Sequence, residues 1–151
     1  MAYTTEEGRT QILDDSAAAV QQLSIAIASL GEAYEHLDEQ SGDRMEAALF
    51  RPLQSAYGQL KRTHAEFASR AGLPGRDFPA APPPAPEDPR SSLEHAADAM
   101  QAADEILAEL QDSLLPVEVG DLELRSGLSS TRSLIAPLPE RCDDFIRTLG
   151  R

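Results

Sequence analysis

The stretch LDDSAAAVQQLSIAIASLGEAYEHL, residues 13–37, decides the fold class of this chain. Its apolar residues recur at alternating spacings of three and four, which draws one apolar stripe along a helix. The stripe positions are Leu13, Ser16, Val20, Leu23, Ile27, Leu30, Tyr34 and Leu37. The pattern predicts a long amphipathic helix that buries this stripe against other helices.

The same pattern returns later in the chain. Residues 93–117 match the first stretch at an offset of 80 residues, and residues 128–149 match residues 50–71 at an offset of 78. An isolated amphipathic hairpin cannot bury its own stripe, so two copies in one chain predict a shared core. We therefore expect an all-α protein: a four-helix bundle made of two similar helical hairpins joined by a Pro-rich linker.

Turn signals set the expected boundaries. We expect a single helical-bundle domain over residues 1–151, with a hairpin over 4–72, a Pro-rich linker over 73–90 and a second hairpin over 91–150. A Gly-Asp pair at residues 42–43, repeated at 120–121, predicts the turn and the following N-cap inside each hairpin.

Prolines qualify this picture. The linker holds most of the chain's prolines and favours polyproline II, whose rise of ~3.1 Å per residue would let it reach ~50 Å. That length permits either a plain up-down order of helices or a long crossover. Pro52 in the second predicted helix, and Pro137 and Pro139 in the fourth, predict kinks or breaks because proline lacks a backbone donor.

The formal net charge is -13, and Lys61 is the only lysine. Because nucleic acids and anionic membranes are bound by clustered cations, this charge argues against both as partners. A single cysteine precludes an intramolecular disulfide and favours a reducing compartment. The first residues show no signal-peptide features, and no run of 18 apolar residues follows, so we expect a cytoplasmic protein.

His64 and Cys142 occupy equivalent stripe positions in the two predicted hairpins. If the hairpins pack symmetrically, an imidazole and a thiolate meet, with Tyr57 nearby, and could bind a small ligand or a soft metal ion. A closed zinc site needs four ligands, however, and the stripes offer only two. The other interpretation is a buried imidazole bonded to a hydroxyl, beside an inert thiol. No cofactor motif is present, and we expect no cofactor.

Two acidic clusters offer a second chemistry. The pairs Glu32/Glu35 and Glu109/Asp112 resemble the Glu-x-x-Glu pairs that hold magnesium in all-helical nucleotide pyrophosphohydrolases. That resemblance implies a metal-dependent hydrolase and covers these pairs alone. Their separation along the chain exceeds that family's pattern, and a solvated helix face is the favoured explanation of both clusters.

Exposed apolar residues point to a third possibility. Ile25 falls on the outer side of the first predicted helix, while Leu115, Val119 and Leu122 crowd the second hairpin turn. They either plug the end of the bundle or form a partner surface. Since no catalytic motif stands out, we expect a non-catalytic interaction or scaffold protein that binds another protein or itself. The alternatives are a ligand- or metal-binding bundle that uses His64 and Cys142, and the acidic-cluster hydrolase.

Overall fold

The computed structural model describes residues 5–149, and every regular element in this range is helical, which confirms the predicted all-α class. The elements are α1 (Thr5–Glu35), α2 (Glu39–Met45), the π-helical turn η1 (Glu46–Phe50), α3 (Arg51–Ala71), α4 (Pro89–Asp112), α5 (Leu115–Glu118), α6 (Leu122–Ile135) and α7 (Leu138–Leu149). The predicted hairpin ends at Thr4 and Gly150 lie outside the described residues. Within the described range, no helix combines the length and apolar character needed to cross a bilayer.

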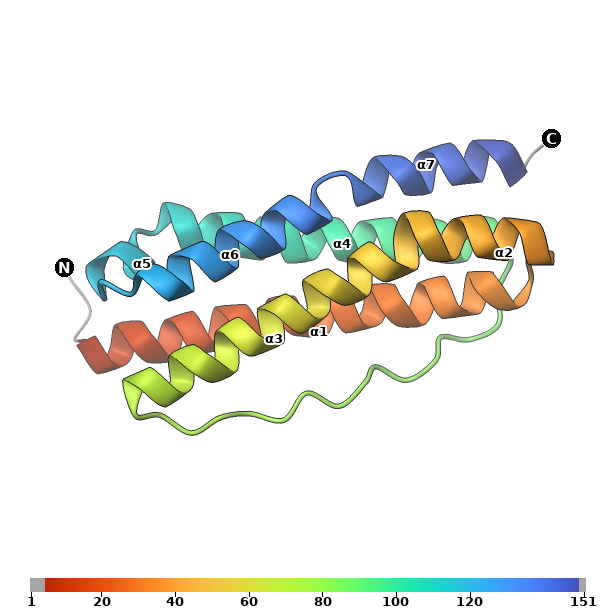
Figure 1. Cartoon of the computed structure of the whole chain (residues 1–151). Coiled ribbons are helices and arrows are strands. Elements are labelled where there is room, and N and C mark those ends of the chain that lie inside the picture. The colour runs from red at the N-terminus through yellow and green to blue at the C-terminus, as the bar shows by residue number, and fades with distance from the viewer. Residues whose placement is uncertain (1–4, 150–151) are drawn as a thin grey trace.

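The long helices lie alongside one another in an elongated molecule (Figure 1). α1 packs chiefly against α4, and α3 packs against α6, with further contacts between α1 and α3 and between α4 and α7. The linker, residues 73–88, runs outside α1 and α3 from one end of the molecule to the other (Figure 1). Because it returns the chain to the opposite end, α3 and α4 run in the same direction, which is the long-crossover order.

The apolar stripes form the core. Leu23, Leu30, Leu60 and Leu107 are all 0% exposed, and one cluster of buried side chains draws on α1, α3, α4, α6 and α7. Burial of one such side chain is worth about 1.5–3 kcal/mol. A row of small residues beside the α1 stripe is fully buried as well: Ala19, Ala26 and Ala33.

The turn of the first hairpin differs from its prediction. The chain turns before Gly42, at Asp38, whose carboxylate caps α2 by accepting from the Ser41 amide at 2.7 Å. Gly42 lies buried within α2, where a Cβ atom would stand 3.0 Å from the Tyr34 ring. The predicted N-cap at Asp43 is therefore wrong, because ring packing on Gly42 places the helix start earlier.

The start of α4 also differs by two residues. Asp88 is its N-cap and accepts from the Ser91 amide at 2.9 Å, and Pro89 is the first helical residue. Proline suits that position because the amide it lacks has no helical partner there. The linker thus ends at residue 88 instead of 90.

The internal prolines bend one predicted helix and divide the other. Before Pro52, the Arg51 amide bonds to the Glu46 carbonyl five residues back, and the resulting π-helical turn leads into α3 without a break. At Pro137 the fourth predicted helix separates into α6 and α7. Both pieces still bury their stripes, with Leu128 and Leu138 at 0% exposure.

Asp121 holds the start of α6, as its predicted N-cap role requires. It accepts from the Leu124 amide at 2.8 Å and from Arg70 of α3 at 2.8 Å. The bond from Arg70 lowers the pKa of this carboxyl. The stability that the ionised Asp121 carboxylate contributes is thus present above its unfolded-state pKa of about 3.9. It is lost as pH falls through the lower pKa of Asp121 in the folded state.

We expect Asp121→Ala to lower the free energy of unfolding by about 1–2 kcal/mol, because it removes both the cap and the Arg70 ion pair. Asp121→Asn is the matched control: it keeps the cap and loses the charge, so its loss should be less than half as large. Urea unfolding at pH 7 followed by circular dichroism measures both. Equal losses for the two variants would show that the ion pair, and not the cap, matters.

Candidate functional site

The candidate site is a groove between α1 and the linker, here called the α1–linker groove. Its volume is about 750 Å³, and it is open to solvent along its length. Binding pockets commonly span about 300–1,000 Å³ and have mainly apolar linings. The apolar lining includes Val20, Ile25, Ala28, Tyr57, Phe78 and Pro82. Size and lining together make this groove the leading candidate for a binding site.

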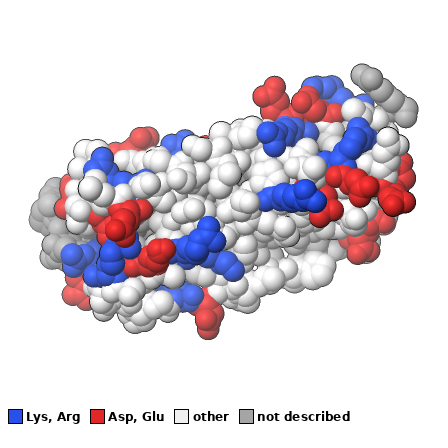
Figure 2. Space-filling view, viewed as in Figure 1, with Lys and Arg blue, Asp and Glu red and all other residues white. Residues whose placement is uncertain are grey.

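Charge is missing from the middle of this groove. Residues 16–31 of α1 and residues 78–86 of the linker contain no charged residue, in a chain of which 26% is charged. The charged lining residues Asp14, Arg76 and Asp77 all belong to one end of the groove. In Figure 2 the lower edge, where the linker runs, is white over much of its right half. The groove is therefore an uncharged strip on an acidic protein.

Three contacts hold the linker wall in place. The Ala81 amide donates to the Ser24 hydroxyl of α1 at 2.8 Å, and Arg76 donates to Asp14 at 2.6 Å. The Phe78 ring meets the His64 ring edge-on, with centroids 5.0 Å apart. One hydrogen bond, one ion pair and one ring contact thus fix an otherwise irregular segment along α1 and α3.

His64 lies behind this wall and is 1% exposed. Both ring nitrogens are buried and neither makes a hydrogen bond of normal geometry. Burial, helped by the nearby Arg76 cation, lowers the pKa of His64, and the Leu13 backbone offsets part of that shift. The imidazole is consequently neutral at pH 7, and the hydroxyl partner that one interpretation gave it is not found.

Cys142 is fully buried in α7, where burial raises the pKa of its thiol to about 12. The thiol is therefore protonated at neutral pH, and it is a poor nucleophile and metal ligand. Its neighbour Arg141 donates to the Ala48 carbonyl of η1 at 3.0 Å. These contacts place Cys142 beside η1, away from the groove.

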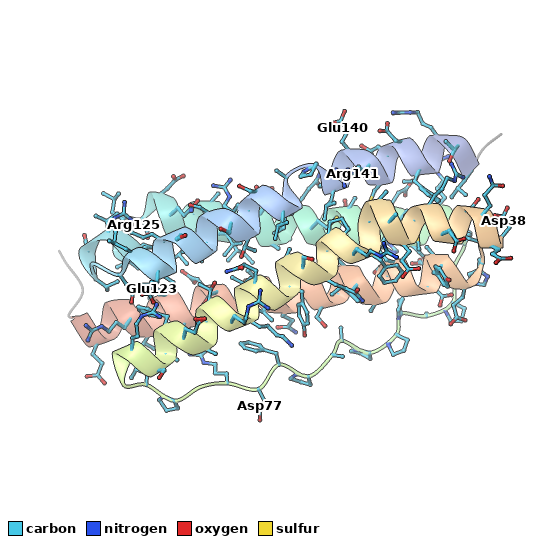
Figure 3. The ribbon with its side chains drawn as sticks, in the orientation of Figure 1. Asp38, Asp77, Glu123, Arg125, Glu140 and Arg141 are labelled. Carbon is cyan, nitrogen blue, oxygen red and sulfur yellow. The ribbon has the colours of Figure 1, made fainter. Side chains whose placement is uncertain are left out.

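The structure does not bring His64 and Cys142 together. Figure 3 shows Arg141, next to Cys142, on the inner side of α7 in the upper half of the view, whereas Asp77, next to the Phe78 that contacts His64, lies on the linker at the lower edge. The two residues are separated because α3 and the α6–α7 segment run in opposite directions (Figure 1). A residue in the C-terminal half of α3 and a residue in the C-terminal half of the α6–α7 segment therefore lie toward opposite ends of the molecule.

Tyr57, the third residue of that predicted site, belongs to the groove instead. Its half-buried ring forms part of the lining, and the Lys61 ammonium lies 4.4 Å from the ring centroid. Such a cation–π contact orients the ring and costs the lysine little hydration.

The two acidic clusters lie far apart. Glu32 pairs with His36 at 3.0 Å near the end of α1, whereas Glu109 of α4 lies close enough to Asp15 to influence its carboxyl. Asp15 and Glu32 are roughly 25 Å apart along α1 at 1.5 Å per residue. Among the described residues, no group of three or more His, Cys, Asp or Glu side chains is arranged to hold a metal ion.

The predicted partner residues fall on two separate surfaces. Ile25 is 37% exposed and lines the groove, whereas Leu122 is 72% exposed at the far hairpin turn. Leu115 is buried and Val119 is half-buried, so these two residues close the end of the helices and do not form an exposed partner surface. Leu114 and Val117 of the same hairpin turn are also exposed, which the sequence did not predict, and these two residues and Leu122 are here called the second apolar patch.

The linker side of the groove was also missed. The sequence did contain an indication of this groove, because the two charge-free runs at 16–31 and 78–86 are unusual in a chain that is 26% charged. The sequence matches no protein-family model, and comparison with curated proteins and with solved structures gave no significant match.

Proposed function

We propose that this protein is a non-catalytic interaction protein that binds an uncharged, apolar segment of a partner protein in the α1–linker groove. One observation carries the proposal: two charge-free runs, far apart in the sequence, line a single groove on a protein of net charge -13. Elsewhere on the chain, carboxylates dominate the charged residues.

Desolvation selects the chemistry of the partner. A charged group that enters the middle of the groove loses hydration and finds no counter-charge there. An aliphatic segment loses nothing comparable and covers Ile25 and the exposed small residues of α1. A cationic partner, by contrast, is drawn to the acidic faces elsewhere on the surface.

The shape of the groove favours a chain segment over a compact ligand. The lining on α1 extends from Asp14 to Ser29, about four turns or ~22 Å, and the opposite wall is the extended linker. Grooves of this form receive helices or extended peptides. The one charged contact at the mouth, Arg76 with Asp14, is satisfied internally, so the lining offers binding and no evident reaction.

We propose that the helices that support this groove form a four-helix bundle of two related hairpins. One hairpin contains α1 and α3, and the other contains α4, α6 and α7. The packing of α1 on α4 and of α3 on α6 supports this arrangement. The linker occurs only once, so the proposed duplication would supply two similar hairpins but a single groove.

Blocked synthetic peptides test the proposed function. The probe is a capped 16-residue peptide of Ala, Leu, Ser and Gln, compared with versions carrying several Lys or several Glu, each titrated against the full chain by NMR at about pH 7.5. We expect the uncharged peptide to bind most tightly. Ile25→Asp should weaken it by at least about tenfold, equivalent to ~1.4 kcal/mol, because it places a charge in the groove.

Leu122→Asp is the matched control, since it adds the same charge at the second apolar patch. The affinity of the Leu122→Asp variant for the uncharged peptide should stay within about twofold of that of the unmodified protein, a difference below ~0.5 kcal/mol. If Leu122→Asp abolished binding and Ile25→Asp did not, the site would lie at the hairpin turn. A dimer in light scattering that Ile25→Asp dissociates would replace the partner segment with a second copy.

A further inference from the structure

Phe78 is the only aromatic residue of the linker, and it covers a buried histidine. Most of the linker is exposed, whereas Phe78 is half-buried with its ring edge-on to His64 at an interplanar angle of 88°. The linker is a single layer of chain outside α1 and α3 (Figure 1). Phe78 therefore separates His64 from solvent on the side where the least protein covers it.

His64 is poorly adapted to carry a charge where it lies. Its two nitrogens are buried without hydrogen bonds, and a buried group in that state is costly even when neutral. Protonation would add a buried charge, and the Leu13 backbone nearby offsets only part of the cost of that burial. The other histidines differ: His36 and His95 are exposed and pair with Glu32 at 3.0 Å and Glu87 at 2.8 Å.

The charged groups that face His64 do not compensate. Arg76 of the linker would repel an imidazolium, and Asp14 of α1 is already bonded to Arg76. On α3 itself, the Lys61 ammonium lies over the Tyr57 ring. An imidazolium at this position would be better solvated in water, and the Phe78 ring of the single-layered linker is the cover in direct contact with it (Figure 1).

We infer that the His64–Phe78 contact is a proton-operated latch, which holds the linker wall of the α1–linker groove in place near neutral pH and releases it in acid. The released state binds a proton more readily than the closed one, so acid favours release and neutral pH favours closure. As a form of regulation, the inference rests on the proposed function, because this wall bounds the proposed binding site. Binding in the groove would then weaken as pH falls below about 6.5, the ordinary pKa of histidine.

The test uses the full chain without any ligand. Amide hydrogen exchange of Phe78, Ala80 and Ala81 is measured by NMR at about pH 7.5 and about pH 5, and each rate is divided by the intrinsic rate at that pH. We expect the normalised rates to rise by at least about fivefold at the lower pH, while core amides of α4 remain protected. The His64 ring resonances should titrate together with the linker.

Variants identify the titrating group. In His64→Phe the ring remains and cannot be protonated, so the acid-induced rise should disappear; His64→Gln serves the same purpose if that variant does not fold. His36→Gln and His95→Gln are the matched controls and should keep the rise. The same rise in a non-titrating His64 variant, or loss of α4 protection along with the linker, would overturn the latch.

The two proposals fail separately. Absence of peptide binding at pH 7.5 in a protein whose linker still opens in acid would reject the binding site and keep the latch. Peptide binding at pH 7.5 with pH-independent linker exchange would reject the latch and keep the site.

Discussion

Gly127→Ala is expected to destabilise the protein, although alanine is the better helix former. Gly127 is buried in α6 against α3, and a Cβ atom there would stand 2.2 Å from Thr63 Oγ1 and 3.0 Å from Thr63 Cβ. Overpacking of this kind costs about 1–3 kcal/mol or more, against the ~1 kcal/mol that helix propensity returns. Because no rotation of Thr63 moves its Cβ, α3 and α6 must separate, and we place the cost at the upper end. We expect a net loss of about 2 kcal/mol in urea unfolding.

Two variants control for propensity and for the clash itself. At Gly31 of α1, no neighbouring atom lies within 4 Å of the position that a Cβ would occupy, so Gly31→Ala should stabilise by about 0.5–1 kcal/mol. Adding Thr63→Ala to Gly127→Ala removes the two closest atoms and should recover most of the loss. If Gly127→Ala alone were stabilising, the close approach of α3 and α6 would be contradicted.

The helical core was predictable because its signal is local and periodic. Stripe residues such as Leu23, Leu107 and Phe145 are buried, as the three-four spacing requires. Stripe ends are less reliable: Tyr34 occupies a stripe position, yet it is 43% exposed and packs edge-on against Phe50 instead. The end of a helix has neighbours on fewer sides, so periodicity alone does not decide burial there.

The turn of the first hairpin could not be decided from local signals. Asp38 and Asp43 are equally good N-caps by residue type, and Gly42 reads as a turn in isolation. What decides between them is a tertiary contact, the Tyr34 ring lying against Gly42. In the second hairpin no such ring intervenes, and the predicted cap at Asp121 is the observed one.

The candidate site depended on the path of the linker, which the sequence left open. A linker of this length permits both helix orders, and only the crossover places residues 78–86 beside residues 16–31. The contact that fixes this register joins the Ala81 amide to the Ser24 hydroxyl. Both groups are too common in sequences to identify such a pair. The same unknown order left open whether His64 and Cys142 could meet.

Leu107→Ala is expected to have the largest effect of any single substitution considered. Leu107 of α4 is 0% exposed and belongs to the buried cluster that joins α1 and α4, where the buried residues of α1 include the small Ser16 and Ala19. Cavities left by leucine-to-alanine changes cost about 2–5 kcal/mol, depending on how far the surroundings collapse. Small side chains such as these cannot fill the cavity by changing rotamer, so we expect Leu107→Ala to lower the free energy of unfolding by about 4 kcal/mol, measured by urea unfolding.

Leu122→Ala is the matched control for that loss, because Leu122 is 72% exposed and its truncation leaves no cavity. Its effect should stay within about 0.5 kcal/mol. The contrast tests the packing of α1 on α4 directly, since the two variants lose the same atoms and differ in burial. A loss below about 1 kcal/mol for Leu107→Ala would mean that water reaches this interface in solution. The α1 wall of the groove would then lack the rigid support on which a preformed binding site depends.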